Sequence, residues 1–218
     1  MLLVRDWMAR EVVTVEPDTT AAEALALCRK HGIRHLPVLE GGWLIGLISD
    51  RNLRSATPAL GDPSRAEALQ SIRVGDEMVR DVATARPEDP VEDVAAVMYE
   101  RKIGCLPVIE GDSLVGIVTS SDVMKALARL VGVHEPGSRL EVALPDRPGS
   151  LAGIAGITRD AGVNIVSVLV APGPDSGGQH IVVLRLATID PGEIVAKLGE
   201  AGYSVLWPPE THLGEGRP

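Results

Sequence analysis

Apolar positions in the N-terminal part of the chain follow a pattern that returns after 70 residues without a gap. Residues 4–53 recur at 74–123, and the run Leu-Pro-Val stands at 36–38 and again at 106–108. Leu44–Ser49 likewise matches Leu114–Thr119. Two copies of one unit usually bury their apolar faces against each other. The pattern therefore predicts a paired fold with two related clefts.

Within each copy the spacing predicts strand, helix, strand, strand, helix. Glu11–Glu16 is the expected first strand, and Thr20 with Glu23 forms a capping box that begins a helix ending at Gly32. In the second copy, Asp89 is the predicted N-cap and Pro90 the first helical residue. The remaining expected elements are strands Leu36–Glu40 and Leu44–Ser49 joined by Gly41-Gly42, strands Leu106–Glu110 and Leu114–Thr119 joined by Gly111-Asp112, and closing helices, the clearer at Asp122–Val131.

Two segments rich in Pro and Gly, Thr57–Ser71 and Gly132–Ser138, are predicted to be linkers. After the second, the pattern changes to βαββαβ, which is the ferredoxin-like order. The elements expected there are strands Arg139–Leu144, Val163–Val170, Gln179–Leu186 and Tyr203–Trp207, with helices at Gly149–Ala161 and from Asp190-Pro191 to about Gly202. The tail from Pro208 to Pro218 is expected to be mobile.

Composition narrows the class of protein. Hydrophobic residues make up 45% of the 218 residues, but Phe is absent, so the cores must consist of Val, Ile, Leu and Ala. A net charge of −9 argues against a nucleic-acid partner. With only two cysteines, no visible signal peptide and no apolar run of the ~18 residues that a membrane span needs, we expect a cytoplasmic protein without a membrane partner.

Three motifs in the doubled part resemble a tandem pair of CBS domains. They are Met8 and Met78 at the start of each copy, the Leu-Pro-Val strands, and Gly-x-x-Ser/Thr-x-x-Asn/Asp at 46–52 and 116–122. The C-terminal part is similar to an ACT domain through Leu144–Leu151 and Gly162–Ile165. The order CBS–CBS–ACT at this length resembles the acetoin-utilisation accessory (AcuB-type) proteins. The predicted class is α+β, with CBS repeats at 1–71 and 72–132, a linker at 133–138, an ACT domain at 139–207 and a tail at 208–218.

Thr119 and Asp122 are the first candidates for ligand binding, because they lie three residues apart where a strand meets a helix. The hydroxyl and the free helix N–H groups suit a phosphate, and a carboxylate can accept both hydroxyls of a ribose. The alternative is a helix cap with no ligand. The resemblance to CBS domains implies an adenosine nucleotide, AMP or ATP, with Ile103 beside the base and Thr84 as a polar contact.

The first repeat departs from this pattern. Ser49 and Asn52 stand where Thr119 and Asp122 stand in the second. An amide has one acceptor oxygen and no charge, so a weaker grip on a diol is expected. Arg51 can reach a phosphate. Thr14 and Ile33, which match Thr84 and Ile103, complete this second candidate cleft, and the sequence leaves open whether it is occupied.

Two further groups of residues have the spacing of a binding site. In the ACT-like part, Asp146, Gly149 and Asn164 can bind an amino acid between paired copies, or Gly149 can simply permit a turn. The spacing Cys28-x-x-His31-x-x-x-His35 resembles part of a metal site, but a core cysteine with two unrelated histidines is favoured. No metal site and no catalytic residues are therefore predicted.

The leading hypothesis is a non-catalytic regulatory protein that senses an adenosine-containing ligand, forms a homodimer and acts on a partner enzyme. It requires no cofactor, and acetoin or acetate metabolism enters only through the resemblance. An amino-acid-responsive ACT module with the CBS pair as scaffold is the second hypothesis. An enzyme with unrecognised active residues is the third.

Overall fold

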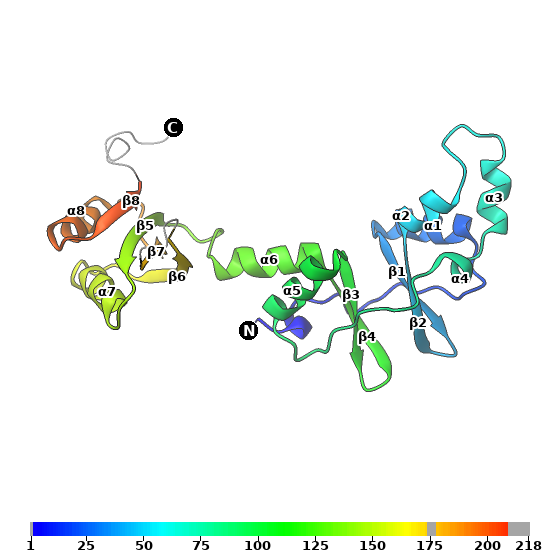
Figure 1. The fold of residues 1–218 in the computed structure, drawn as a ribbon, viewed down its shortest axis with the longest axis horizontal. Coiled ribbons are helices and arrows are strands. Elements are labelled where there is room, and N and C mark those ends of the chain that lie inside the picture. The colour runs from blue at the N-terminus through cyan, green and yellow to red at the C-terminus, as the bar shows by residue number, and fades with distance from the viewer. Residues whose placement is uncertain (1, 174–177, 209–218) are drawn as a thin grey trace. The chain divides into compact units, whose positions relative to one another are not determined.

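The computed structural model describes residues 2–173 and 178–208, which form two compact units divided between Ala126 and Leu127. Figure 1 shows the elements of each unit, and each unit is described by itself. Residues 209–218 of the predicted tail, and residues 174–177 between the strands expected at Val163–Val170 and Gln179–Leu186, lie outside the described residues.

The two repeats of the N-terminal unit have the same core elements in the same order, helix, hairpin and helix. In repeat one these are α1 (Ala21–His31), β1 (His35–Glu40), β2 (Trp43–Ser49) and α2 (Asp50–Ala56). In repeat two they are α5 (Val91–Arg101), β3 (Cys105–Glu110), β4 (Ser113–Thr119) and α6 (Ser120–Leu130). The tight hairpins are confirmed, since Glu40 pairs with Trp43 and Glu110 with Ser113.

The start of each repeat is less regular than predicted. The strand predicted at Glu11–Glu16 is wrong, because only Val15 makes a bridge, to Val38. Pro37 of β1 has no N–H to donate toward Val13, so the parallel ladder does not extend to the earlier residues. The capping box of Thr20 and the end of α1 at Gly32 are confirmed, with φ of 65° at Gly32.

The N-cap predicted for α5 is wrong by one residue. Pro90 occupies that position, and the Asp89 carboxylate instead accepts a hydrogen bond from the Arg86 N–H at 2.7 Å. A short polar side chain in front of a proline can close a turn on its own backbone as readily as cap a helix.

The two repeats exchange their first segments. The segment around η1 (Val4–Asp6) lies on repeat two, where Ala9 forms a bridge with Ile117. The segment around α4 (Val74–Glu77) lies on repeat one, where Val79 forms a bridge with Leu47. Each repeat therefore contributes its first segment to the fold of the other repeat.

Glycine makes this exchange possible. A Cβ at Gly116 would lie 2.5 Å from Met8 Sδ and 3.0 Å from the Ala9 carbonyl oxygen, and Gly46 faces Met78 in the same way. Only a residue without a side chain admits such a close approach. The glycine of the repeated Gly-x-x-Ser/Thr motif thus serves contact between repeats.

The linker predicted at Thr57–Ser71 contains a helix, α3 (Arg65–Ser71). The glycine and prolines of that segment precede the helix, whereas Ala66, Glu67 and Leu69 are good helix formers. Leu69 packs against the core of repeat one. That core consists of Val15, Ala21, Ala24, Cys28, Leu36, Val38, Ile48, Leu53, Val74 and Met78.

The C-terminal unit has the predicted βαββαβ order. Its elements are β5 (Ser138–Pro145), α7 (Ser150–Asp160), β6 (Ile165–Pro172), β7 (Gln179–Leu186), α8 (Gly192–Glu200) and β8 (Ser204–Trp207). The sheet is antiparallel in the order β6-β7-β5-β8, with both helices on one face (Figure 1). Alternate strand residues, among them Leu140, Val142 and Leu184, are buried there against Ile154 and Ile194.

Candidate functional site

A cleft of about 1070 Å³ lies between the two repeats of the N-terminal unit. The exchanged pair Leu47 and Val79 forms part of its wall, joined by two backbone hydrogen bonds of 2.9 Å. The other walls come from the β2–α2 junction, from the segment after Val79 and from the start of β3. The lining residues are Arg34, His35, Leu47, Ser49, Asp50, Arg51, Asn52, Arg54, Ser55, Val79, Asp81, Val82, Ala83, Lys102, Ile103, Gly104 and Cys105.

The cleft has a local excess of positive charge in a chain whose net charge is −9. Its four cationic side chains face two carboxylates, those of Asp50 and Asp81. Asp50 is already paired with Arg54 at 3.3 Å. Arg34, Arg51 and Lys102 make no ion pair with any residue that the structure describes. These three cations can therefore meet an anionic ligand.

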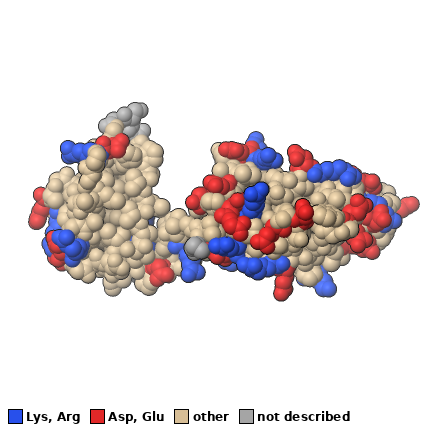
Figure 2. Space-filling model, turned by 90° about the horizontal axis from the view of Figure 1, so that it is seen from below, with Lys and Arg blue, Asp and Glu red and all other residues tan. Residues whose placement is uncertain are grey.

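Figure 2 shows one face of each unit. On that face, acidic and basic side chains are interspersed over the N-terminal unit, whereas the C-terminal unit presents a broad uncharged area.

Lys102 lies at the edge of the cleft in an unusual backbone conformation. It follows the last residue of α5 with φ of 55°, the only positive φ of a non-glycine residue among those described. Repeat one has Gly32 at the matching place, with φ of 65°. A side chain in this left-handed conformation costs free energy, and such strain is often found at functional sites.

Ser49 and Asn52 are held together at the beginning of α2. The Ser49 hydroxyl accepts a hydrogen bond from the Asn52 N–H at 3.1 Å and donates one to Asn52 Oδ1. An amide oxygen has two lone pairs, so Asn52 can still accept one hydrogen bond at Oδ1 as well as donate from its NH2 group. Asn52 therefore offers a ligand both a donor and one remaining acceptor position.

Thr119 and Asp122 form the equivalent junction in repeat two, and they are not among the residues lining this cleft. Asp122 Oδ2 accepts hydrogen bonds from the Thr119 N–H at 2.9 Å and from its hydroxyl at 2.6 Å. These two hydrogen bonds match the helix cap that the sequence offers as the alternative to ligand binding. Oδ1 accepts none from a described residue, so one oxygen stays open to a ligand.

The structure differs from the predicted grouping of residues. Ile103 was expected beside Thr119 and Asp122, but it lines the cleft at the β2–α2 junction of repeat one. The packing of the two repeats explains the position of Ile103, because it places the start of β3 opposite the β2–α2 junction of repeat one. Thr14, Thr84 and Ile33 are outside the lining of this cleft.

His35 and Cys105 line the cleft from the first residues of β1 and β3. Burial lowers the pKa of His35 below its ordinary 6.5, which favours a neutral imidazole. Burial also raises the pKa of the Cys105 thiol to about 12, so the thiolate is scarce. Among residues 2–173 and 178–208, no group of three His, Cys, Asp or Glu side chains is placed to hold a metal ion.

The candidate residues of the C-terminal unit do not meet within one chain. Asp146 follows the end of β5, 3.6 Å from His180 Nδ1, and Gly149 begins α7 with φ of 86°. Asn164 precedes β6, whose first residue is in register with the opposite end of the sheet. A site that used both Asp146 and Asn164 would need a second copy of the chain.

Two domain types account for this architecture, and both are regulatory modules. The CBS domain matches residues 4–58 and 74–129, and the ACT domain matches residues 138–202. The chain belongs to the CBS-domain family, as a tandem CBS pair followed by a C-terminal ACT domain.

Similar proteins agree with this assignment. The chain is 32% identical over 123 residues to the CBS domain-containing protein YhcV of Bacillus subtilis, covering 56% of this chain and 84% of YhcV. A Vibrio cholerae protein named AcuB, for acetoin utilization, has a structure that matches with a TM-score of 0.52 at 32% identity, covering 62% of this chain and 99% of AcuB.

Two similar structures were solved with adenosine compounds. The CBS pair of protein MJ0100, in complex with 5′-methylthioadenosine and S-adenosyl-L-methionine, matches at 29% identity and a TM-score of 0.50, over 58% of this chain and 96% of that one. CBSX2 in complex with AMP matches at 26% identity and a TM-score of 0.52, over 60% and 99%. None of the described helices is both long and apolar enough to span a membrane.

Proposed function

We propose that this chain is a regulatory protein whose CBS pair senses an adenosine nucleotide. The observation that carries the proposal is the cleft between the repeats, where Arg34, Arg51 and Lys102 have no anionic partner among the described residues. The AMP and S-adenosylmethionine complexes of similar CBS proteins support an adenosine-type ligand.

The charge of the cleft favours AMP or ATP over S-adenosylmethionine. A phosphate carries negative charge that the three cations can pair with, whereas a sulfonium would add a positive charge. In the proposed pose the phosphate lies near Arg51 and Lys102, Asn52 donates a hydrogen bond and Ile103 packs against the base. We propose the junction of Thr119 and Asp122, with Thr84, Thr14 and Ile33, as a second and weaker site.

The proposed role is non-catalytic, since both domain types are regulatory modules. We further propose a cytoplasmic homodimer that acts on a partner enzyme, and the similarity to AcuB supports a link to acetoin or acetate metabolism. Light scattering on the full chain is expected to give twice the mass of 23.0 kDa, and a monomer at micromolar concentration would contradict the dimer.

Calorimetric titration of the full chain with AMP, ATP, adenosine and S-adenosylmethionine tests the ligand. AMP or ATP is expected to bind more tightly than adenosine, and saturation at a hundred times Kd should stabilise the fold by about 2.7 kcal/mol. Arg51→Gln is expected to weaken AMP binding about tenfold or more, since a hydrogen bond to a charged group contributes about 1.5–3 kcal/mol. The matched control is Lys30→Gln, which removes a cation of α1 outside the cleft.

The relative weight of the two sites is tested by Asn52→Ala and Asp122→Ala. Because Asn52 lines the cleft and Asp122 does not, we expect Asn52→Ala to weaken AMP binding more than Asp122→Ala does, which is the opposite of the order expected from the sequence. No binding of any adenosine compound at millimolar concentration would refute the sensor.

A further inference from the structure

A second pocket, of about 510 Å³, lies in repeat one between α1, the beginning of α2 and the segment that contains α3. Its lining residues are Ala22, Leu25, Cys28, Arg29, Gly32, Ile33, Arg34, Asp50, Arg54, Leu60, Arg65 and Leu69. Three of these, Arg34, Asp50 and Arg54, also line the cleft between the repeats, so the two hollows share a wall.

The pocket combines apolar walls with guanidinium groups. Leu25, Ile33, Leu60 and Leu69 supply apolar surface, and Leu60 is 89% exposed although it faces a hollow. The cost of leaving so much apolar surface in water would fall if an apolar group filled the pocket.

Four arginines and one carboxylate surround these walls. Arg54 is paired with Asp50, and the Arg65 guanidinium donates to the Pro58 carbonyl oxygen, which anchors the linker. Arg29 and Arg34 have no ion pair or side-chain hydrogen bond with a described residue. Two guanidinium groups are thus available beside an apolar hollow.

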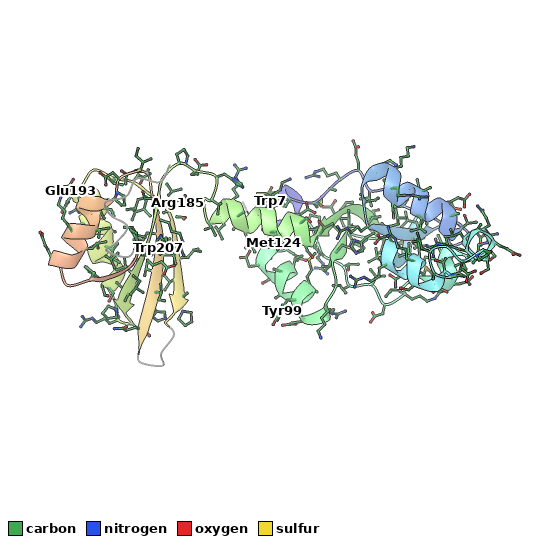
Figure 3. All side chains as sticks on the ribbon, turned by 90° about the horizontal axis from the view of Figure 1, so that it is seen from above. Trp7, Tyr99, Met124, Arg185, Glu193 and Trp207 are labelled. Atoms are coloured by element: carbon green, nitrogen blue, oxygen red, sulfur yellow. The ribbon has the colours of Figure 1, made fainter. Side chains whose placement is uncertain are left out.

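Repeat two provides an internal comparison, because each of its positions is displaced by 70. Arg29 corresponds to Tyr99, and Arg54 corresponds to Met124. Tyr99 and Met124 project from α5 and α6 (Figure 3), and they are 85% and 67% exposed. Arg34 corresponds to Gly104, so no guanidinium is retained at these three positions. The basic set is therefore a property of repeat one and is not required by the CBS fold itself.

We propose that this pocket binds a small aliphatic carboxylate. Its hydrocarbon chain lies against Leu25, Ile33 and Leu69, and its carboxylate pairs with Arg29 and Arg34. A guanidinium matches a carboxylate through two parallel hydrogen bonds. A ligand with only the apolar part would leave the arginines unpaired, and one with only the charge would leave the leucines exposed.

Calorimetric titration of the full chain with octanoate, and with octanamide as its uncharged counterpart, tests this assignment. Octanoate is expected to bind, and octanamide to bind at least about tenfold more weakly. Arg29→Gln, which removes a guanidinium that lines this pocket and not the cleft, is expected to lose about tenfold or more in octanoate affinity. Lys30→Gln is the matched control, because this cation is next to Arg29 on α1 and does not line the pocket.

The two cysteines provide an independent readout, since Cys28 lines this pocket and Cys105 lines the cleft. Burial raises the pKa of Cys28, so alkylation by iodoacetamide will be slow enough to time. In a Cys105→Ala background, octanoate is expected to slow the alkylation of Cys28. Unchanged alkylation under saturating octanoate would overturn the assignment.

Further outcomes separate this site from the nucleotide cleft. Equal octanoate affinity in wild type and Arg29→Gln, equal binding of octanamide, or no binding at millimolar octanoate would each overturn the carboxylate site while leaving AMP binding intact. Loss of octanoate binding in Lys102→Gly, which removes a cation that lines the cleft and not this pocket, would place octanoate in the cleft and also overturn the proposal. If the wild-type chain binds octanoate but does not bind AMP, the nucleotide sensor is refuted and the carboxylate site is supported.

Discussion

Replacement of Lys102 by glycine is expected to stabilise the N-terminal unit and, at the same time, weaken nucleotide binding. Lys102 has φ of 55° directly after α5, and its backbone N–H donates to the carbonyl groups of Met98 and Tyr99. This is the position after a helix at which glycine is preferred, and repeat one has Gly32 there.

The magnitude follows from two opposing terms. A side chain in the left-handed region costs about 1–2 kcal/mol. Glycine gives back about 0.4–1 kcal/mol, because it increases the conformational freedom of the unfolded chain. The net expectation for Lys102→Gly is a gain of about 0.5–1 kcal/mol in the free energy of unfolding. With a urea dependence of about 1–3 kcal/mol per molar, the midpoint of unfolding should rise by roughly 0.2–1 M.

Urea unfolding followed by tryptophan fluorescence measures this gain. In a Trp207→Phe background the signal comes from Trp7 and Trp43, both in the N-terminal unit. The matched control is Arg101→Gly, which removes the same charge one residue earlier but inside α5, and should lower stability by up to about 1 kcal/mol. An unchanged or lower midpoint for Lys102→Gly would refute the strain.

The affinity for AMP is the second quantity that the Lys102 variants should change. Loss of the ammonium group should weaken AMP binding about tenfold or more, so stability and affinity move in opposite directions. Lys102→Asn removes the charge but tolerates the left-handed conformation, and it should show the same loss of affinity. If Lys102→Gly stabilised the fold and bound AMP as wild type does, the residue would be strained without a role in the cleft.

Three other expectations concern the same unit. Gly116→Ala should lower the free energy of unfolding, measured in urea, by about 1–3 kcal/mol, because its Cβ would lie 2.5 Å from Met8 Sδ. Its control is Gly156→Ala in α7, which has open space around its Cβ and should be neutral or stabilising. Gly32→Ala should cost about 1 kcal/mol without any clash, and an unchanged melting temperature would contradict this. Burial lowers the pKa of His35 in the folded protein, so as the pH falls the unfolded chain binds a proton on this residue before the folded chain does. The stability of wild type relative to His35→Gln should therefore fall as the pH drops below 6.5, and a difference independent of pH would refute it.

Local features were predictable because the interactions that make them span only a few residues. Thr20 and Glu23 are three positions apart, so their capping box follows from spacing alone. Gly41 and Gly42 adopt the positive φ that a two-residue hairpin needs, and a short apolar run marked the strand on either side. The strand expected at Glu11–Glu16 did not form, because a strand needs a neighbour and β1 pairs with this segment only at Val15.

The sequence was enough to determine the repeats, the hairpins and the order of the core helices and strands in each part of the chain. The tertiary structure was needed to show that the repeats exchange their first segments, that Ile103 faces the junction of the other repeat and that Arg34 and Lys102 line one cleft with Arg51. It also decided that α3 closes a pocket over Arg29 and Arg34. The physical reason is range: backbone hydrogen bonds and caps act between near neighbours, whereas a cleft exists only where distant apolar faces have packed and left a space between them.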